Sequence, residues 1–309
     1  YISITKIRRY AMKYKELIDK MTLEEKASLC VGGDYWHSKA IEKLNIPSIT
    51  MSDGPHGLRV QKTKADNLGI NESEISTCFP ASSTIGNSWN KETAYMLGNT
   101  LGEEAAYENV DIVLGPAINI KRTPLCGRNF EYFSEDPYLT GVCACEIAKG
   151  VQENHPVLVC PKHFAVNEQE TFRRGNSKRN YDAVDSILTE RAAREIYLKP
   201  FEMLVRDAEV ACIMTSFNKI NGIFAGGNKD LCTHILRDEW GFKGAVVTDW
   251  GDMDVVVDGA DAVAAGNDIV MPGGPPVIRQ ILKGYNEGRV TRSELESAVS
   301  HLLDMSGRI

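Results

Sequence analysis

Short runs of apolar, often β-branched residues alternate with longer segments of helical periodicity along most of this 309-residue chain. Such alternation is typical of repeated strand–helix units around a parallel sheet, whose strands are buried on both faces. The predicted strands cover residues 46–51, 82–85, 111–114, 157–160, 210–215, 245–247 and 268–271. The predicted helices cover residues 13–31 with a break near Thr22, then 90–107, 137–152, 189–207, 229–239, 254–265, 275–287 and 292–305.

We therefore predict an α/β fold, and a (β/α)8 TIM-like barrel is its most economical closure. An incomplete or irregular barrel stays open, because no eighth strand is evident. We expect one barrel domain over residues 13–309, preceded by an N-terminal extension or linker over residues 1–12. Hydrophobic residues make up 43% of the chain and charged residues 25%, which is ordinary for a globular domain with a large core.

Charge and hydropathy narrow the class of partner. The formal net charge of −7 disfavours a nucleic-acid binder and a protein that binds anionic membranes. No apolar run approaches the roughly 18 residues of a membrane-spanning helix.

The cysteines predict reduced thiols. The chain has 8 Cys and 6 His, with no CxxC pair and no spacing typical of a zinc site. The first residues mix isoleucines with Lys6, Arg8 and Arg9 and lack the apolar core of a secretory signal. We therefore expect a cytoplasmic protein without a metal site.

The segment from Gly244 to Asp252 suggests where the chemistry lies. Its short apolar strand ends at Asp249 and Trp250, and in α/β barrels the carboxyl ends of the strands open into the active site. A carboxylate there can attack an anomeric carbon, and an indole can lie against the apolar face of a pyranose. The alternative is that Asp249 simply caps the next helix.

Other polar or site-lining candidates also follow predicted strands. They are Asp53, Arg59, Arg128, Lys162, His163, Met214 and Phe217. Each has a simpler explanation: Asp53 precedes Gly54 as in an ordinary turn, Arg128 could pair with Glu131 or Glu135 on the surface, and His163 could be structural. Lys162 could merely neutralise a nearby carboxylate. Their common position favours a shared site, since in a barrel these ends converge on one mouth.

At these residues the chain resembles the N-terminal barrel domain of glycoside hydrolase family 3, in its β-glucosidase branch. The motifs run in the family's order from about residue 14 to the end. They are Ser52-Asp-Gly-Pro-His-Gly-Leu-Arg59, Gly115-Pro-Ala-Ile-Asn119, Gly127-Arg-Asn-Phe-Glu-Tyr-Phe-Ser-Glu-Asp-Pro137, Pro161-Lys-His-Phe-Ala165, Arg194-Glu-Ile-Tyr-Leu-Lys-Pro-Phe-Glu202 and Val247-Thr-Asp-Trp-Gly251.

The resemblance implies a retaining, exo-acting β-glucosidase without a metal or organic cofactor. Asp249 would be the nucleophile that forms a covalent glycosyl-enzyme. The residues implied to bind hydroxyls of the sugar are Asp53, Arg59, Arg128, Lys162 and His163. Trp250 and Met214 would line the site. Phe217 stands where the family often has Tyr, so a hydroxyl near the nucleophile would be missing.

The same resemblance leaves two questions open. In this branch the acid/base Glu usually comes from an α/β sandwich domain that is not in this chain, so the chain alone would be inactive or weakly active. A non-catalytic sugar-binding barrel therefore stays open as an alternative. Ala165-Val166-Asn167-Glu168 differs from the Pro-Gly-His-Gly motif of the family's N-acetylglucosaminidases, while a β-xylosidase or arabinofuranosidase of the same family remains possible.

Overall fold

The computed structural model describes residues 14–66, 70–175, 181–251 and 256–309. The helices of the first half are α2 (Lys15–Asp19), α3 (Leu23–Leu29), a short 3-10 turn (Glu42–Leu44), α4 (Ser82–Ser88), α5 (Lys91–Tyr107) and α6 (Pro137–Asn154). Those of the second half are α7 (Glu190–Ala192), α8 (Lys199–Asp207), a 3-10 turn (Ala225–Gly227), α10 (Gly259–Ala265), α11 (Pro275–Asn286) and α12 (Arg292–Ser306). Two π-helical segments, Ala193–Tyr197 and Asp230–Glu239, complete them.

The strands are short and mostly parallel. They are β1 (Met51–Asp53), β2 (Ile112–Leu114), β3 (Leu158–Val159), β4 (Asp185–Ser186), β5 (Cys212–Met214), β6 (Lys219–Ile220), β7 (Ile223–Phe224) and β8 (Ala245–Val247). Parallel pairing joins β1 to β2, β2 to β3, and β5 to β8. Single parallel bridges continue the series from Phe164 to Thr215, from Val247 to Ile269, and from Val31 to Val270.

This topology establishes a mixed α/β fold with parallel neighbours in chain order. It does not confirm a closed eight-stranded barrel, which stays a prediction. The expected strand at 268–271 contributes only the bridges at Ile269 and Val270. The expected strand at 46–51 is also misplaced, because β1 begins at Met51 and makes Asp53 its last residue.

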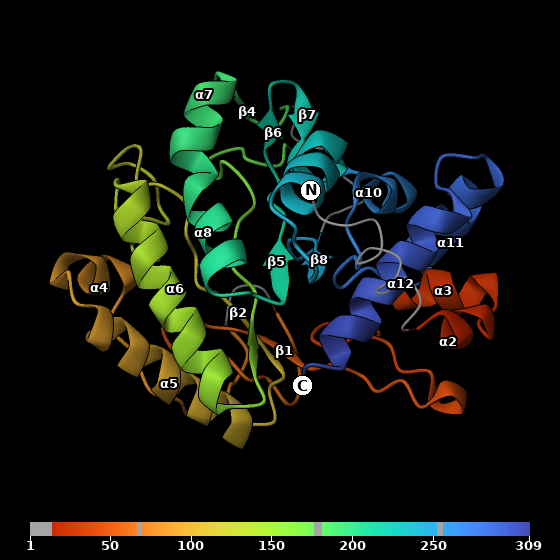
Figure 1. Ribbon diagram of the computed structural model, residues 1–309, viewed down its shortest axis with the longest axis horizontal. Coiled ribbons are helices and arrows are strands. Elements are labelled where there is room, and N and C mark those ends of the chain that lie inside the picture. The colour runs from red at the N-terminus through yellow and green to blue at the C-terminus, as the bar shows by residue number, and fades with distance from the viewer. Residues whose placement is uncertain (1–13, 67–69, 176–180, 252–255) are drawn as a thin grey trace.

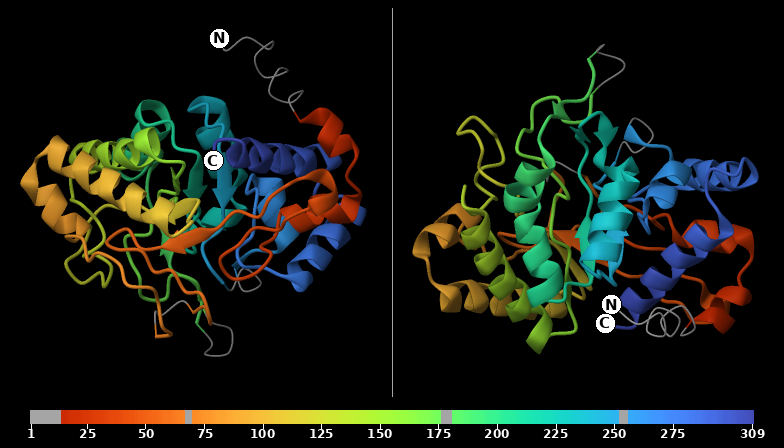
Figure 2. Two further views of the ribbon diagram at one scale, coloured as in Figure 1. Left: turned by 90° about the horizontal axis from the view of Figure 1, so that it is seen from below. Right: turned by 45° about the horizontal axis from the view of Figure 1, so that its top comes forward.

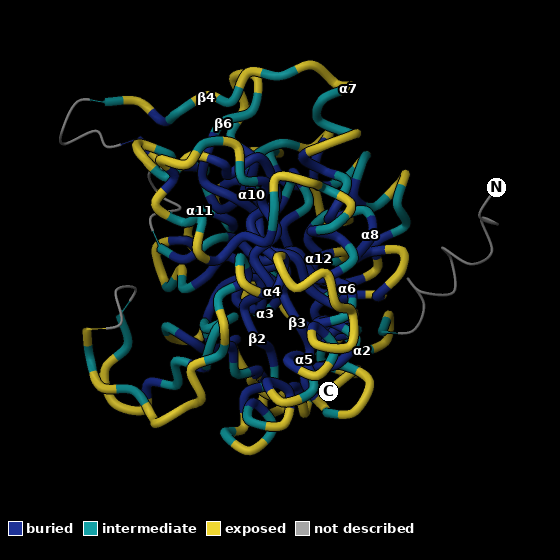
Figure 3. The backbone as a smooth tube through the Cα atoms, turned by 90° about the vertical axis from the view of Figure 1, so that its left-hand side faces the viewer, coloured by how far each residue is buried: buried dark blue, intermediate teal, exposed yellow. Residues whose placement is uncertain are grey.

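The strands are buried on both faces, as expected from their apolar sequences. In β2, Ile112 and Leu114 belong to one hydrophobic cluster and Val113 to a second, and β5 and β8 divide their residues in the same way. The first cluster packs under α3, α10, α11 and α12, and the second under α5, α6 and α8. Figures 1 and 2 show these two groups of helices on opposite sides of the strands, and Figure 3 shows that the buried residues gather in the middle of the fold.

The helices predicted at 90–107, 137–152, 275–287 and 292–305 are confirmed, and several helix starts have clear local causes. Asn90 and Asp136 cap α5 and α6 by accepting a backbone N–H with their side chains. Thr22 and Thr291 form capping boxes that begin α3 and α12. The box at Thr22 is also the break expected within residues 13–31. The expected N-terminal extension and the starts of the helices expected at 13–31 and 254–265 cannot be compared, because residues 1–13, 254 and 255 lie outside the described residues.

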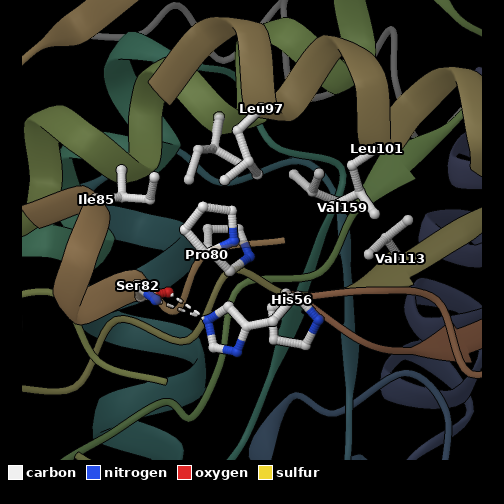
Figure 4. A pocket seen from close by; sticks show the side chains of 12 residues that line it. His56, Pro80, Ser82, Ile85, Leu97, Leu101, Val113 and Val159 are labelled. Carbon is white, nitrogen blue, oxygen red and sulfur yellow. Dashed lines mark hydrogen bonds between the residues drawn. The ribbon is translucent and has the colours of Figure 1, made fainter. Parts of the chain in front are cut away.

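The predicted strand at 82–85 is wrong, because these residues begin α4. The buried positions Ser82, Ile85 and Gly86 recur at helical spacing, so the segment buries one face of a helix. Ser82 N–H donates to Nε2 of His56 at 2.9 Å, which provides an acceptor at the start of this helix. Figure 4 shows this pair beside a small cavity of about 10 Å³ lined mainly by apolar side chains.

Two further expectations need correction. The predicted loop at 216–227 contains the β6–β7 hairpin, in which Asn221 and Gly222 have φ angles of 48° and 90°. These are the residues that a tight two-residue hairpin turn favours. The predicted helix at 189–207 is divided by the π-helical segment between α7 and α8.

Candidate active site

One pocket of about 440 Å³ brings together all the residues that the sequence suggested for the site. They are Asp53, Arg59, Arg128, Lys162, His163, Met214, Phe217, Asp249 and Trp250. They lie at the carboxyl ends of β1, β2, β3, β5 and β8 or in the segments that follow. This arrangement follows from the parallel pairing of the strands, which places these ends on one side. The chemical roles of the residues stay predictions.

Asp53, at the end of β1, lies between two cations. Lys162 Nζ donates to its Oδ1 at 2.6 Å, and Arg59 Nη2 donates to Oδ2 at 3.2 Å. Burial would raise the pKa of the Asp53 carboxyl, but Lys162, with smaller effects from Arg59 and Arg128, outweighs it and holds this pKa below its ordinary value. The three side chains therefore present charged donors and acceptors, which make strong hydrogen bonds to hydroxyl groups.

Asp249 follows β8 and is 12% exposed as a side chain. Arg173 Nη1 donates to its Oδ2 at 3.1 Å, and Nε2 of His163 lies 4.0 Å from the same oxygen. The backbone N–H of Trp250 donates to Oδ1 at 2.7 Å. The carboxylate is thus fixed in orientation where a ligand in the pocket would meet it.

His163 is positioned by Asn119. Asn119 Nδ2 donates to the His163 carbonyl at 2.9 Å, and Asn119 Oδ1 accepts from the His163 backbone N–H at 2.9 Å. Burial, reinforced by Arg128, Lys162 and Arg173, lowers the pKa of the His163 imidazole well below its ordinary value. Since Asn119 Oδ1 also lies 3.3 Å from Nδ1, Nδ1 would carry the proton and leave Nε2 as an acceptor toward the pocket.

Arg128 belongs to a network that continues to the Asp249 side of the pocket. Its Nε donates to Glu131, and its Nη1 lies 3.7 Å from Oε2 of Glu170. Arg173 Nε lies 3.2 Å from Oε1 of Glu170. Arg128 does pair with Glu131, but not on the surface as the simpler explanation would have it, because these side chains are only 19% and 6% exposed.

Aromatic rings line another part of the pocket. Trp36 and Trp250 have ring centroids 5.6 Å apart, and Trp250 Nε1 donates to the Tyr35 carbonyl at 2.7 Å. The Arg59 guanidinium lies 5.6 Å from the centre of the Trp36 ring. Phe217 has no hydroxyl to offer to Asp249, and the Arg173 guanidinium lies over its ring at 4.9 Å.

Sequence reasoning missed several residues that line the same pocket. They are Trp36, Leu114, Glu170, Phe172, Arg173, Arg174 and Tyr181. Arg173 matters most, because it contacts Asp249 directly. No strand ends just before Arg173, and adjacent arginines in a long polar segment usually form a solvated surface. Neither position nor composition therefore indicated a site residue here.

Glu168 is buried beside Asn119, the residue that positions His163. Its Oε1 accepts the Ile120 N–H at 3.1 Å, while its Oε2 is buried without a hydrogen-bond partner among the described residues. Burial raises the pKa of this carboxyl to about 7, although the hydrogen bonds from Ile120 and Asn119 oppose the shift. The protein therefore holds a buried charge here only when the pH rises above neutrality.

Glu168→Gln is expected to reduce the stability that wild type loses as the pH rises from 5 to 8. Between the ordinary pKa near 4.5 and about 7, the native state binds more protons at this site than the unfolded chain. The stability that a protonated Glu168 contributes is therefore present below about pH 4.5 and lost as the pH rises to about 7. Relative to wild type, the unfolding free energy of the variant should gain about 2–3 kcal/mol between pH 5 and pH 8.

Urea unfolding at both pH values measures this change. Glu103→Gln, which alters an exposed glutamate of α5, is the matched control and should show no such gain. A Glu168→Gln variant whose stability parallels wild type from pH 5 to pH 8 would contradict the assignment.

Two features are absent from the described ranges of the chain. No set of three His, Cys, Asp or Glu side chains there is arranged to bind a metal ion. None of the helices in those ranges combines the length and the apolar character needed to cross a bilayer.

Known proteins resemble this chain in both sequence and fold. "Thermostable beta-glucosidase B" of Acetivibrio thermocellus is 46% identical over 294 residues, which are 95% of this chain and 37% of that protein. "Exo-alpha-(1->6)-L-arabinopyranosidase" of Bifidobacterium breve is 42% identical over 93% of this chain and 36% of its own length. The structure of beta-glucosidase 3B from Thermotoga neapolitana in complex with glucose has a TM-score of 0.85 and 35% identity, over 96% of this chain and 42% of that one.

The chain therefore spans little more than a third of the curated relatives that it matches. The family described as "Glycosyl hydrolase family 3 N terminal domain" matches residues 27–305. With this match across nearly the whole described fold, and with relatives above 40% identity, the chain belongs to glycosyl hydrolase family 3.

Proposed function

We propose that this chain carries the sugar-binding site and the nucleophile of a retaining, exo-acting β-glucosidase. The observation that carries the proposal is the setting of Asp249, whose carboxylate faces the pocket between Arg173 and His163. The pair of Asp53 and Lys162 shares this pocket and supplies charged partners for hydroxyl groups. The relatives named as β-glucosidases support the choice of a β-glucoside as substrate.

In the proposed reaction, an Asp249 oxygen attacks the anomeric carbon as the leaving group departs with its bonding electrons. Arg173 and the Trp250 N–H fix the direction of attack, because each donates to a different oxygen of this carboxylate. Water then cleaves the covalent glycosyl-enzyme at the same carbon. The two displacements together retain the anomeric configuration.

The acid/base would come from outside this chain, from a second domain in cis. The short coverage of the relatives supports such a domain. Three nearby glutamates are engaged in other contacts: Glu131 pairs with Arg128, Glu170 pairs with Arg173, and Glu168 accepts the Ile120 N–H.

A specific observation favours an α-L-arabinopyranosidase as a second candidate. Two relatives that are 42% identical carry the name exo-α-(1→6)-L-arabinopyranosidase. Such a substrate is also a pyranoside, so the same nucleophile and charged partners would serve it. The two candidates differ in the hydroxyl orientation and ring substituent that the pocket must accept.

Trapping of a covalent intermediate tests the proposed function. The reagent is 2,4-dinitrophenyl 2-deoxy-2-fluoro-β-D-glucoside, whose leaving group needs little acid assistance. Fluorine at C2 disfavours the oxocarbenium-like transition state and thus slows hydrolysis of the adduct. We expect a single 2-fluoroglucosyl label, and peptide mass mapping should place it on Asp249.

The corresponding 2-fluoro reagents of β-galactose and α-L-arabinopyranose form the comparison. Faster labelling by the arabinopyranosyl reagent would favour the second candidate. A chain that binds glucose but accepts no label would favour the non-catalytic sugar-binding alternative. A label on another carboxylate would contradict the assignment of Asp249.

A further inference from the structure

We propose that Phe172 and Tyr181 form an aglycone subsite, which takes a leaving group with a flat, apolar face. The inference rests on the proposed function, because it concerns the part of the substrate that leaves. Both side chains line the pocket that contains Asp249. Their ring centroids lie 4.5 Å apart, with 51° between the ring planes.

The Phe172 ring is exposed where most large rings of this chain are not. It is 55% exposed, whereas Tyr132, Phe164 and Phe201 are fully buried in the core. An exposed aromatic ring that contacts a second ring offers an apolar surface without taking part in the core. At the edge of a ligand pocket, such a surface favours contact with the apolar part of a ligand.

The backbone places Phe172 one residue from a contact of the proposed nucleophile. Arg173, the next residue, reaches Asp249 and is 16% exposed as a side chain. Phe172 itself has a φ of 59°, a left-handed conformation that is rare for a bulky residue and that often occurs at functional sites. Its carbonyl accepts the N–H groups of Gly175 and Val184 at 3.2 and 3.0 Å, which fixes this turn near the segment that carries Tyr181.

Burial divides the lining of the pocket into two parts. The inner part contains Lys162 and His163, which are 4% and 1% exposed, together with Asp249. The outer, more exposed part contains the rings of Phe172 and Tyr181 together with Arg174. A glycoside with a flat aglycone has the same division, since its sugar is rich in hydroxyls and its leaving group is apolar on one face. An aryl group and the apolar face of a second pyranose share this chemistry.

Two trapping reagents that share a sugar and differ in the leaving group test the subsite. One is the dinitrophenyl 2-fluoroglucoside, and the other is 2-deoxy-2-fluoro-β-D-glucosyl fluoride, whose leaving group has no apolar face. The variants are Phe172→Ala, Tyr181→Ala and the double variant. We expect the labelling efficiency with the dinitrophenyl reagent, relative to that with the fluoride, to fall about tenfold in the double variant.

Tyr107→Ala is the matched control, because Tyr107 is an 83% exposed aromatic residue of α5 outside the pocket. It should leave the ratio of the two labelling efficiencies at the wild-type value. Labelling by the fluoride also reports directly that the inner site of each variant is folded.

A second comparison distinguishes an aryl group from a second sugar as the occupant of the aglycone subsite. Glucose and cellobiose are compared as protectants against labelling by the fluoride. Weaker protection by cellobiose alone in the double variant would extend the subsite to a second pyranose. A changed ratio of labelling with unchanged protection would restrict it to aryl groups.

An unchanged ratio together with unchanged protection by cellobiose would overturn the inference while leaving Asp249 labelled. Failure of both reagents to label the wild-type chain would overturn the proposed function, and the inference with it.

Discussion

Asp249→Asn is expected to lower the rate of dinitrophenolate release from 2,4-dinitrophenyl β-D-glucoside by about 10⁴-fold or more. Loss of the nucleophile lowers the kcat of other enzymes by a similar factor. The amide has nearly the shape of the carboxylate but cannot attack the anomeric carbon. The measurement is the single-turnover rate of release at saturating enzyme, which needs no regeneration of the site. Glucose binding, measured by calorimetry, shows whether the pocket of the variant is intact.

Asp53→Asn is the matched comparison, because it neutralises another carboxylate of the same pocket. We expect it to weaken sugar binding through the lost partner of Lys162 and Arg59. A covalent label should still form at saturating reagent. If Asp53→Asn abolished labelling and Asp249→Asn preserved it, the two proposed roles would be reversed.

Azide is expected to restore the activity of Asp249→Gly, a variant in which the whole side chain is removed. The removed side chain leaves room for this anion on the face from which the carboxylate would attack. We expect azide to restore dinitrophenolate release and to yield α-glucosyl azide, because a single displacement inverts the β-linkage. A β-configured product would contradict attack from the Asp249 side.

The sequence supported prediction of the site where its residues follow strands. Lys162 and His163 follow β3, Asp249 follows β8, and parallel pairing then places them in one pocket. Such a prediction depends only on where each strand ends, which a short apolar run indicates well. It fails for Arg173, which reaches Asp249 from a long segment between β3 and β4 without a strand beside it.

The errors in the fold have similar physical causes. Residues 82–85 form part of a helix because Ser82 finds its acceptor on His56, a residue 26 positions away that no local pattern reveals. The β6–β7 hairpin differs, since its signal, Asn221 followed by Gly222, was present in the sequence. Those strands are only two residues long, too short for an alternating pattern to support the turn.

The carboxylate of Asp268, like the site residues, makes polar contacts with residues that are far away in the sequence. Asp268, 2% exposed, accepts from Arg237 Nη2 at 2.6 Å, from the Val246 N–H at 2.6 Å and from His301 Nδ1 at 2.9 Å. One carboxylate thereby joins the π-helical segment 230–239, β8 and α12. Arg237 is itself only 12% exposed, and Asp268 is the carboxylate that compensates its buried charge.

Asp268→Ala is therefore expected to lower the free energy of unfolding by about 3–5 kcal/mol, because it leaves the buried Arg237 guanidinium without its carboxylate. Denaturant unfolding at pH 7 measures the loss. Asp19→Ala is the control: it breaks the exposed ion pair between Asp19 and Lys15 on α2, so only a small loss of stability is expected. Asp268→Asn, which keeps a neutral acceptor for Val246, should lie between them. If Asp268→Ala cost no more than Asp19→Ala, the carboxylate would not be what joins β8 to α12.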